Sequence, residues 1–462
     1  MNSILSEDIF EEKQIQSQIG DFFKTCQIGK LLKQANFNKE KGVPCSQIFR
    51  FIFMLIFTGK NLYQYLLSGC CEQLAKDTIY RFLNSYHFNW RKFLFSLSST
   101  IIRDTVVPLT SVDRVKVLIF DDSLYSRNRS KAVELLAKVY DHVEHKYVRG
   151  FRMLTLGWSD GNTFLPLAFS LLSSAQEKNR INEADNRIDS RSNGFKLRRE
   201  CIKKSTEVMF DLLDQLAPYD VDARYLLFDS WFSYPKVILE TFKRNLHVVC
   251  MLKRMPNVFY GFLGERMNLK QLYNYIYKKP GKAKILASKI VELGKDDNGE
   301  IVKVKIVFVR DRCSKKWLAL LTTDINLTEE DVVRIYGKRW DIEVFFKMSK
   351  SFLKLAKEFQ GRSYDSMVAH TTIVFCRYMM LSLESRNNKD PRTLGNLFYI
   401  CCDEMQDISF TQAVLLILDL LKRSLTDLLF LTEQKVNEFL NHFCASLSVL
   451  FKKKLKISMC ES

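Results

Sequence analysis

The chain has 462 residues, of which 47% are hydrophobic and 26% are charged, which excludes a disordered protein and leaves room for two or three domains with a large core. Lysine and arginine number 70 against 52 aspartates and glutamates, so the formal net charge is +18. An excess of this size favours a polyanionic partner. Nucleic acid and an anionic membrane surface both fit, and a basic protein without a specific polyanion is the simpler alternative.

Neither a membrane span nor an export signal is predicted. The best apolar run, residues 48–57, contains Arg50 and is too short, because a span needs about 20 residues. The first residues, M-N-S-I-L-S-E-D, lack the basic segment and apolar block of a secretory signal. The 12 cysteines include no C-x-x-C pair and lie in apolar patterns, as is typical of reduced thiols. We therefore predict a cytoplasmic protein with no membrane partner.

Residues 1–110 are predicted to be helical. Apolar residues recur at helical spacing, as at Ile48, Ile52 and Leu55, and lysines and arginines punctuate the region. The stretch A-K-D-T-I-Y-R-F-L-N (75–84) fits the second helix of a helix-turn-helix, although a plain helical bundle fits about equally well. The prediction is a helical N-terminal region that binds DNA.

The pattern then changes from helices to strands. Residues 115–120, V-K-V-L-I-F, predict a short strand that ends at Asp121, and a polar loop follows. Asp160-Gly161 lies between two apolar runs, which indicates a β-hairpin. The polar residues 174–200 predict a flexible surface loop.

A second buried strand, A-R-Y-L-L-F, ends at Asp229 and is followed by a helix from Pro235 and the strand H-V-V-C-M-L, an order typical of α/β sheets. Strands and turns then alternate, which predicts an antiparallel insertion, and the pattern is helical from residue 365 onward. The predicted parts are a helical N-terminal region (1–110), an α/β domain (111–252 and 326–365), a β-rich insertion (253–325) and a helical C-terminal region (366–462).

A helix is predicted to begin after L-T-E-E-D, where Thr328 and Asp331 have the spacing of a capping-box-like start. At about 100° per residue, five polar side chains fall within an arc of roughly 80° between apolar flanks. This polar stripe consists of Tyr336, Arg339, Glu343, Lys347 and Lys350. It indicates one acid among cations that face an anion, and the alternative is a row of intrahelical ion pairs.

Three carboxylates are candidates for one site. Asp121 and Asp229 each follow a buried strand, and ligands gather at the carboxyl ends of strands in α/β sheets. Glu343 adds a third carboxylate, and three carboxylates without a Cys/His set suit Mg²⁺ or Mn²⁺. Two such ions can activate a water and stabilise the leaving oxygen in phosphodiester cleavage. For each aspartate taken singly, a turn at the end of a strand is the simpler interpretation.

The spacing Tyr336-x2-Arg339-x3-Glu343-x6-Lys350 resembles the Y-R-E-K signature of the insertion-sequence-four-type DDE transposases. The resemblance covers about half of the chain, roughly residues 115–360. It implies an RNase H-like catalytic domain with a β-rich insertion between the second and third acids. It also implies cut-and-paste DNA transposition by hydrolysis and strand transfer, by a route that can include a hairpin intermediate.

The family pattern assigns roles to individual residues. Asp121 in L-I-F-D-D-S resembles the first acid, with Asp122 as the alternative, and Asp229 in L-L-F-D-S-W resembles the second. With Glu343 as the third, these residues are the implied catalytic and metal-binding set. Trp317 stands where the family has a tryptophan that stacks on a flipped base, and a core aromatic is the other interpretation.

The resemblance also implies partners. The other members of the polar stripe, Tyr336, Arg339, Lys347 and Lys350, would contact DNA phosphates near the cut. The implied partners are double-stranded DNA with terminal inverted repeats and a second copy of the chain in a synaptic complex. The implied setting is the nucleoid of a bacterial or archaeal host. Two alternatives remain open, namely a DNA-binding protein without chemistry (a decayed transposase or a regulator) and a plain metal-dependent nuclease.

Overall fold

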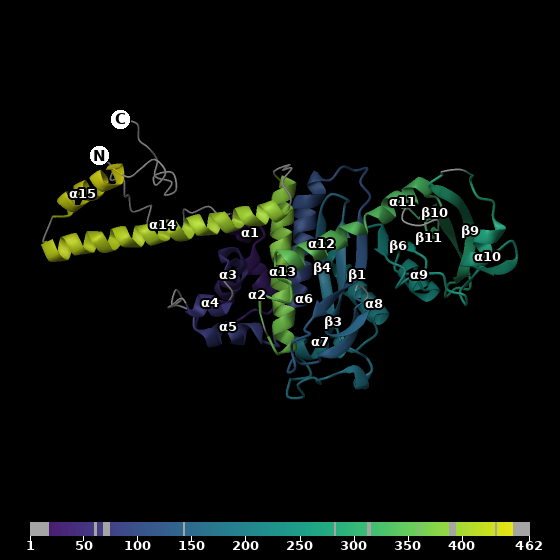
Figure 1. Cartoon of the computed structure of the whole chain (residues 1–462), viewed down its shortest axis with the longest axis horizontal. Helices are drawn as coiled ribbons and strands as arrows, with labels where there is room; N and C mark the ends of the chain where they lie inside the picture. The colour runs from purple at the N-terminus through teal and green to yellow at the C-terminus, as the bar shows by residue number, and fades with distance from the viewer. Residues whose placement is uncertain are drawn as a thin grey trace.

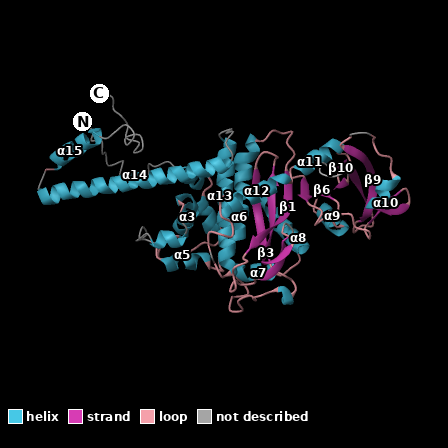
Figure 2. Ribbon diagram, in the orientation of Figure 1, coloured by secondary structure: helices cyan, strands magenta, loops and turns pink. Residues whose placement is uncertain are grey.

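The computed structural model of the chain is a mixed α/β structure, in which helices surround one large sheet (Figures 1 and 2). The structure describes residues 18–59, 62–67, 74–141, 144–280, 283–311, 316–359, 361–387, 394–429 and 432–446. Within these ranges eleven strands belong to the sheet, which contains both parallel and antiparallel pairs. The predicted α/β class is therefore confirmed.

Five strands form the half of the sheet that carries Asp121 and Asp229. Their order is β4 (Phe164–Leu172), β3 (Lys146–Ser159), β1 (Val117–Ser126), β5 (Tyr225–Phe228) and β6 (His247–Met251). β1 pairs antiparallel with β3 and parallel with β5, and β6 is parallel to β5. All of β5 is buried, as expected of a strand with neighbours on both edges and cover on both faces.

Two predicted connections in this half are confirmed. Asp160-Gly161 forms the turn between β3 and β4, which pair antiparallel. Gly161 has a φ of +85°, and a Cβ there would lie 2.8 Å from Nζ of Lys338, so the turn requires glycine. α9 (Pro235–Phe242) joins the parallel strands β5 and β6 and begins with proline in its first turn. A further strand, β2 (Ala137–Asp141), pairs with the start of β3.

The sheet continues past β6 into the residues of the predicted insertion. These contain β7 (Phe259–Phe262), β8 (Glu265–Asn268), α10 (Leu269–Tyr275), β9 (Ile285–Lys295), β10 (Ile301–Arg310) and β11 (Trp317–Thr322). β11 is antiparallel to β6, with Leu320 opposite Met251, and β10, β9, β7 and β8 follow in that order. The strands at 253–325 therefore extend the same sheet edge to edge.

Helices form the N-terminal region, as predicted. They are α1 (Gln18–Thr25), α2 (Ile28–Gln34), α3 (Cys45–Leu55), α4 (Leu62–Leu67), α5 (Lys76–Leu83) and α6 (Trp90–Ile101). Their core is aromatic: the ring of Phe37 stacks on Phe88 at 4.4 Å, and Phe49 meets Phe93 edge-on at 5.4 Å. α6 packs against β4 and thereby attaches this region to the sheet. Residues 1–17 lie outside the described residues.

The C-terminal region is also helical. α13 (Tyr364–Asn387) lies between the N-terminal helices and the sheet, and α14 (Leu394–Leu429) projects away from the body (Figure 1). α15 (Glu433–Ser446) packs against α14 through a small separate core. None of the helices in the described ranges combines the length and apolarity that crossing a membrane requires. Residues 447–462 lie outside the described residues.

The surface loop predicted at 174–200 is wrong at its C-terminal end. α7 (Asn193–Cys201) begins inside that stretch, because the hydroxyl of Ser192 caps it by accepting a hydrogen bond from the Phe195 amide at 3.2 Å. α8 (Ser205–Leu216) follows after a short break. Arg198 in α7 is buried, so a residue predicted to lie in a solvated loop is part of the interior.

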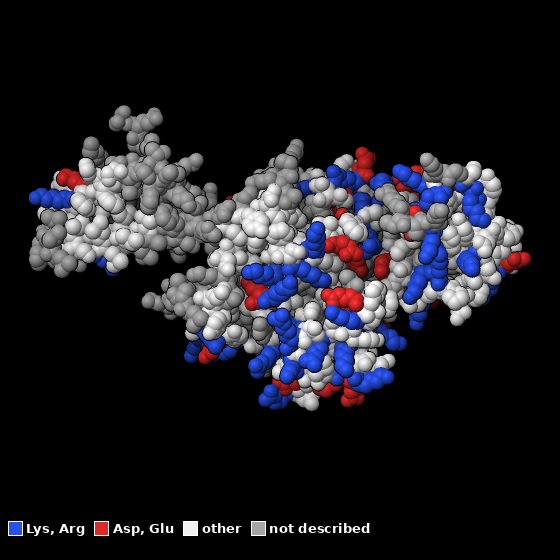
Figure 3. All heavy atoms as spheres, viewed as in Figure 1, with Lys and Arg blue, Asp and Glu red and all other residues white. Residues whose placement is uncertain are grey.

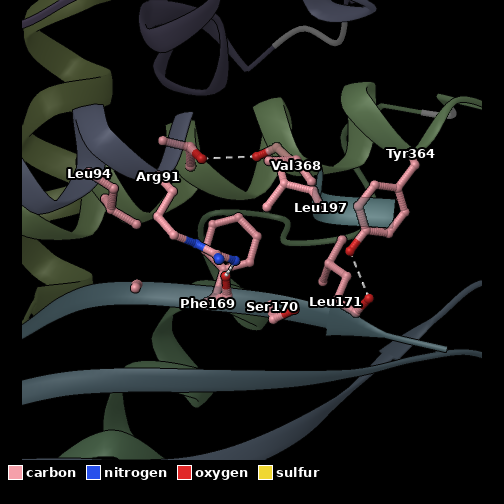
Figure 4. Close-up of a pocket in the computed structure, with 10 residues that line it drawn as sticks. Arg91, Leu94, Phe169, Ser170, Leu171, Leu197, Tyr364 and Val368 are labelled. Atoms are coloured by element: carbon pink, nitrogen blue, oxygen red, sulfur yellow. Dashed lines mark hydrogen bonds between the residues drawn. The ribbon is translucent and has the colours of Figure 1, made fainter. Parts of the chain in front are cut away.

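A cavity of about 10 Å³ lies where α6, α7, α13 and β4 meet (Figure 4). Arg91 of α6 donates a hydrogen bond to the carbonyl oxygen of Phe169 at 2.9 Å and another to the Glu200 carboxylate at 2.6 Å. The hydroxyl of Tyr364 donates to the carbonyl oxygen of Leu171 at 2.8 Å. These polar groups partner one another, so we interpret the space as a gap in the core packing.

Candidate active site

Asp121 lies inside β1, so the prediction that the strand ends there is wrong. β1 continues to Ser126 because residues 121–126 pair with residues 150–155 of β3. Pairing with β3 therefore holds the main chain at Asp121 in the sheet. A strand position is more rigid than a loop position, which favours a precise placement of this carboxylate.

The parallel neighbour of β1 brings the second acid to the first. Val117 of β1 lies opposite Tyr225 of β5, and the register continues to Ile119. Extending this register places Asp121 beside Asp229, which directly follows β5 as predicted. Because neighbouring strands lie about 4.8 Å apart, the sheet itself sets two carboxylates next to each other.

Two helices, not one, carry the polar stripe, so the prediction of an uninterrupted helix is wrong. α11 (Glu329–Gly337) ends before the third acid, and α12 (Trp340–Ser351) begins after a break at residues 338–339. The predicted cap is confirmed, since the hydroxyl of Thr328 accepts a hydrogen bond from the Asp331 amide at 3.1 Å. The break turns α12 onto β1 and β4, against which it packs.

Polar contacts with the β3–β4 turn hold the break in place. Nζ of Lys338 donates a hydrogen bond to the carbonyl oxygen of Asp160 at 2.9 Å. One residue into α12, the carboxylate of Asp341 accepts a hydrogen bond from the hydroxyl of Ser159 at 2.6 Å. The start of α12 is thus fixed to the same strand that pairs with β1.

Arg339 lies between two of the predicted acids. Its Nη1 atom is 2.7 Å from Oδ2 of Asp121 and 3.4 Å from Oε1 of Glu343. The side chain of Asp121 is 11% exposed, whereas that of Glu343 is 42% exposed. Basic and acidic side chains are mixed on the face around α12 and β1 in Figure 3. The guanidinium of Arg339 therefore links Asp121 on β1 to Glu343 on α12.

The acids lie close enough to affect one another. Burial raises the pKa of Asp121 to about 7; the Arg339 guanidinium opposes the rise, and the charges of Asp229 and Glu343 add to it. Burial also raises the pKa of Asp229, against a hydrogen bond from the Trp231 amide at 2.8 Å. A buried site with more carboxylate charge than its one arginine offsets is a candidate for binding a cation.

Asp122 has a different partner on the other face of β1. Successive residues of a strand point to opposite faces, so Asp122 points away from the side of Asp121. Its carboxylate accepts a hydrogen bond from Nε of Arg152 on β3 at 2.9 Å. Its main-chain amide donates to Oδ1 of Asp121 at 2.8 Å. The geometry therefore distinguishes the two neighbouring aspartates.

The remaining members of the polar stripe are spread along α11 and α12. Nζ of Lys350 donates a hydrogen bond to the hydroxyl of Ser123 at 2.5 Å, and Ser123 shares a strand face with Asp121. The ring of Tyr336 lies 6.0 Å from the guanidinium of Arg339. Lys347 is exposed. Sequence reasoning missed Ser123, although its position two residues after Asp121 was a usable signal.

Trp317 is the first residue of β11. Because β11 runs antiparallel to β6, with Leu320 opposite Met251, Trp317 lies near the C-terminal ends of β5 and β6. The ring of Tyr273 stacks on its indole at 4.5 Å, and the guanidinium carbon of Arg254 lies 3.9 Å from the ring centroid. The ring of Phe308 also lies edge-on to the indole at 5.3 Å, so three side chains pack around Trp317. A base would have to displace one of them to stack on Trp317.

The three acids fit a divalent metal ion by their chemistry. Carboxylate oxygens are the ligands that Mg²⁺ and Mn²⁺ prefer. Burial raises the pKa of both Asp121 and Asp229, and a bound cation would oppose this rise because it favours the charged carboxylates. In the arrangement described here, Arg339 lies where such an ion would meet Asp121 and Glu343. In the described ranges, no three His, Cys, Asp or Glu side chains are placed to hold one ion. For all three acids to hold one ion, their carboxylates would therefore have to lie closer together than they do in this structure.

Two families of known proteins match the chain over the region that contains this site. The family described as DDE superfamily endonuclease matches residues 53–263, and the family described as Transposase DDE domain matches residues 200–380. These matches support a DDE transposase. DDE domains are RNase H-like, which agrees with the mixed α/β structure, and this family generally uses divalent metal ions on a DNA substrate. No curated protein matches the chain.

Proposed function

We propose that the chain is a transposase of the insertion-sequence-four type that cuts the ends of its element and joins them to target DNA. The observation that supports the proposal most is the register of β1 and β5, which extends to Asp121 and Asp229, together with Arg339, whose Nη1 atom lies 2.7 Å from Asp121 and 3.4 Å from Glu343. The Y-R-E-K spacing on α11 and α12 supports the type.

In this proposal Asp121, Asp229 and Glu343 hold two Mg²⁺ or Mn²⁺ ions. Such ions, when bound, activate the attacking oxygen and stabilise the leaving oxygen of a phosphodiester. The guanidinium of Arg339 would exchange Asp121 for a DNA phosphate, which offers oxygens at a similar spacing. Lys350 would hold a second phosphate close to the strand that carries Asp121, because its ammonium already lies at Ser123.

The proposed reaction has two steps that balance without a further reactant. In the first, the oxygen of a water bonds to phosphorus while the bond to the 3′ oxygen breaks, which leaves a 3′ hydroxyl. In the second, this hydroxyl bonds to a target phosphorus and the 3′ oxygen of the target strand leaves. The same attack on the opposite strand of the element would give a hairpin. The number of phosphodiester bonds is unchanged in the second step, so no nucleotide hydrolysis is needed.

The proposed substrate is double-stranded DNA with terminal inverted repeats, bound by a dimer in the synaptic complex. The net charge of +18 supports a polyanionic substrate, and the repeats, the dimer and the nucleoid of a bacterial or archaeal host follow from the resemblance. Tyr336 and Lys347 would add contacts to the DNA backbone, and the N-terminal helices would bind the element ends. Terminal inverted repeats in the DNA that flanks the gene would support this part directly.

Replacing the third acid tests the proposal. On a plasmid that carries the gene with its flanking DNA, Glu343→Ala should lower Mg²⁺-dependent cleavage by more than ~100-fold, because even partners of metal ligands contribute about 10–100-fold. DNA binding should be unchanged in a gel-shift assay. Val344→Ala, one residue along α12 on its exposed side, is the matched control and should cut normally. Full cleavage by Glu343→Ala would refute the assignment, and a wild-type chain that binds but never cuts would favour the non-catalytic alternative.

A further inference from the structure

We propose that Trp231 is the platform on which an unpaired base of the bound DNA strand stacks, with Lys253 contacting the adjacent phosphate. The inference rests on the proposed function, because it places that strand at Asp229. It concerns a residue outside the polar stripe and outside the acid set. Trp231 is 45% exposed, which is unusual for a side chain of this size so close to a buried carboxylate.

The turn after β5 fixes the indole beside the second acid. Oδ1 of Asp229 accepts a hydrogen bond from the amide of Trp231 at 2.8 Å, which closes an Asx turn. The next residue, Phe232, is buried and lies edge-on to Phe228 with the ring centroids 6.4 Å apart. Since Phe232 points into the core, the main chain directs Trp231 outward. The position of the indole is therefore coupled to that of the Asp229 carboxylate.

A basic side chain from the next strand end accompanies the indole. Nζ of Lys253 lies 5.6 Å from the ring centroid of Trp231. The buried hydroxyl of Ser233 joins the two segments: it donates to the carbonyl oxygen of Ser230 at 2.9 Å and accepts from the amide of Lys253 at 3.3 Å. A partly exposed aromatic side chain next to an ammonium group matches the needs of a nucleotide, whose base stacks and whose phosphate requires a cation.

Two other tryptophans provide the comparison. The indole of Trp317 is covered by Tyr273 and Arg254, so it is already in use as a packing element. Trp340 is 65% exposed, but it lies one residue along α12 from Arg339. That step turns it by about 100° around the helix from the side chains that face β1. Of the three, Trp231 is the one that joins exposure to a direct hydrogen-bonded link with an acid of the site.

Photo-crosslinking can identify the stacking residue without any cleavage of the DNA. The probe is a forked duplex with 5-iodouracil at its first unpaired position, bound to the full chain in EDTA. Trypsin separates the three indoles, because they fall in the peptides 225–236, 317–334 and 340–347. We expect the crosslink in 225–236. A crosslink in 317–334 or 340–347, or a bound probe that crosslinks to none of the three, would overturn the proposal.

Binding measurements provide the second readout. Trp231→Ala should weaken binding of the forked probe by about 5–150-fold, the range for one base–aromatic stack, and leave binding of the fully paired duplex unchanged. Trp231→Phe should retain part of the affinity that Trp231→Ala loses. Trp340→Ala should bind the forked probe as tightly as the wild-type chain does. Equal loss on both probes would assign Trp231 a structural role. Because no readout requires cutting, the stacking proposal can fail while Glu343-dependent cleavage stands, and the reverse also holds.

Discussion

Arg198 and Arg339 each lie between two carboxylates, yet the two clusters have opposite properties. The cluster of Arg198 is enclosed in the core between α7 and α13. That of Arg339, the surface cluster, lies where α12 meets β1 and opens to solvent at Glu343, which is 42% exposed, although Asp121 is buried. The residue types are the same in both. What differs is how completely the guanidinium is used and how much water reaches its partners.

In the core cluster every nitrogen of the Arg198 guanidinium donates a hydrogen bond. Nε of Arg198 donates to Glu134 at 2.6 Å, Nη2 donates to Asp365 at 2.6 Å, and Nη1 donates to the carbonyl oxygen of Gly194 at 2.9 Å. Burial works to raise the pKa of Glu134, but the hydrogen bonds from Arg198 and two main-chain amides keep it below its usual value. Such a satisfied network stabilises one arrangement of α7 against α13.

In the surface cluster the match is incomplete. One nitrogen of Arg339 serves both Asp121 and Glu343, and Glu343 is 42% exposed. Burial raises the pKa of Asp121 to about 7 in spite of the arginine, and it also raises the pKa of Asp365 in the core cluster, so the two clusters differ in hydrogen bonding and exposure and not in this shift. An arginine–carboxylate contact is therefore not by itself evidence of a structural role. Under the proposed function, the cluster with the weaker match is the one whose arginine would be exchanged for a substrate group.

The largest effect is expected where the cluster is complete. Arg198→Met should lower the free energy of unfolding by about 3–5 kcal/mol, because it leaves Glu134 and Asp365 charged and buried without a cation. Urea unfolding followed by circular dichroism measures this. Arg187→Met is the matched control: its side chain is 89% exposed, so loss of its pair with Asp185 should leave the midpoint of urea unfolding nearly unchanged. Equal effects of the two substitutions would remove the basis of the comparison.

The two clusters also differ in how much of them the sequence predicts. Asp229 was predicted correctly at a strand end because four apolar residues precede it and a turn follows. Arg198 was missed because its partner Asp365 is 167 residues away and its own segment, R-S-N-G-F-K-L-R-R-E, is polar. Local polarity predicts solvent exposure unless a distant opposite charge is folded against it, and no local pattern shows such a partner.

The errors at the candidate site have the same origin. The sequence D-D-S looks like a strand end, but β3 pairs with β1 as far as Ser126 and so keeps Asp121 in the sheet. The polar stripe fits one helix by its spacing, but Lys338 is held by the β3–β4 turn, and this long-range contact accompanies the break in the helix. Residue types and spacing are enough to propose the acids, whereas their surroundings depend on contacts between distant segments.

The next effect concerns the two neighbouring aspartates on β1. Asp121→Asn should reduce Mg²⁺-dependent cleavage by more than ~100-fold, because it removes a proposed ligand. Asp122→Asn should reduce it by no more than ~10-fold, since the Asp122 carboxylate is paired with Arg152 and affects the site through its charge, which adds to the raised pKa values of Asp121 and Asp229. The plasmid cleavage assay compares both, with circular dichroism as the check on folding. The reverse order would make Asp122 the first acid.

The smallest effect expected is also the one that separates the clusters most directly. Arg339→Ala should lower the free energy of unfolding by about 1–3 kcal/mol, less than Arg198→Met. It leaves the buried Asp121 without its partner, but Glu343 is 42% exposed and can be solvated. It should nevertheless lower cleavage by roughly 10–100-fold, which is the contribution of one charge-assisted hydrogen bond to a phosphate. Arg339→Lys keeps the positive charge but loses the planar arrangement of donors in the guanidinium. Its cleavage rate should therefore lie between those of the wild-type chain and Arg339→Ala. If Arg339→Ala destabilised the fold as much as Arg198→Met, Arg339 would be a core ion pair and its exchange for DNA would have to be abandoned.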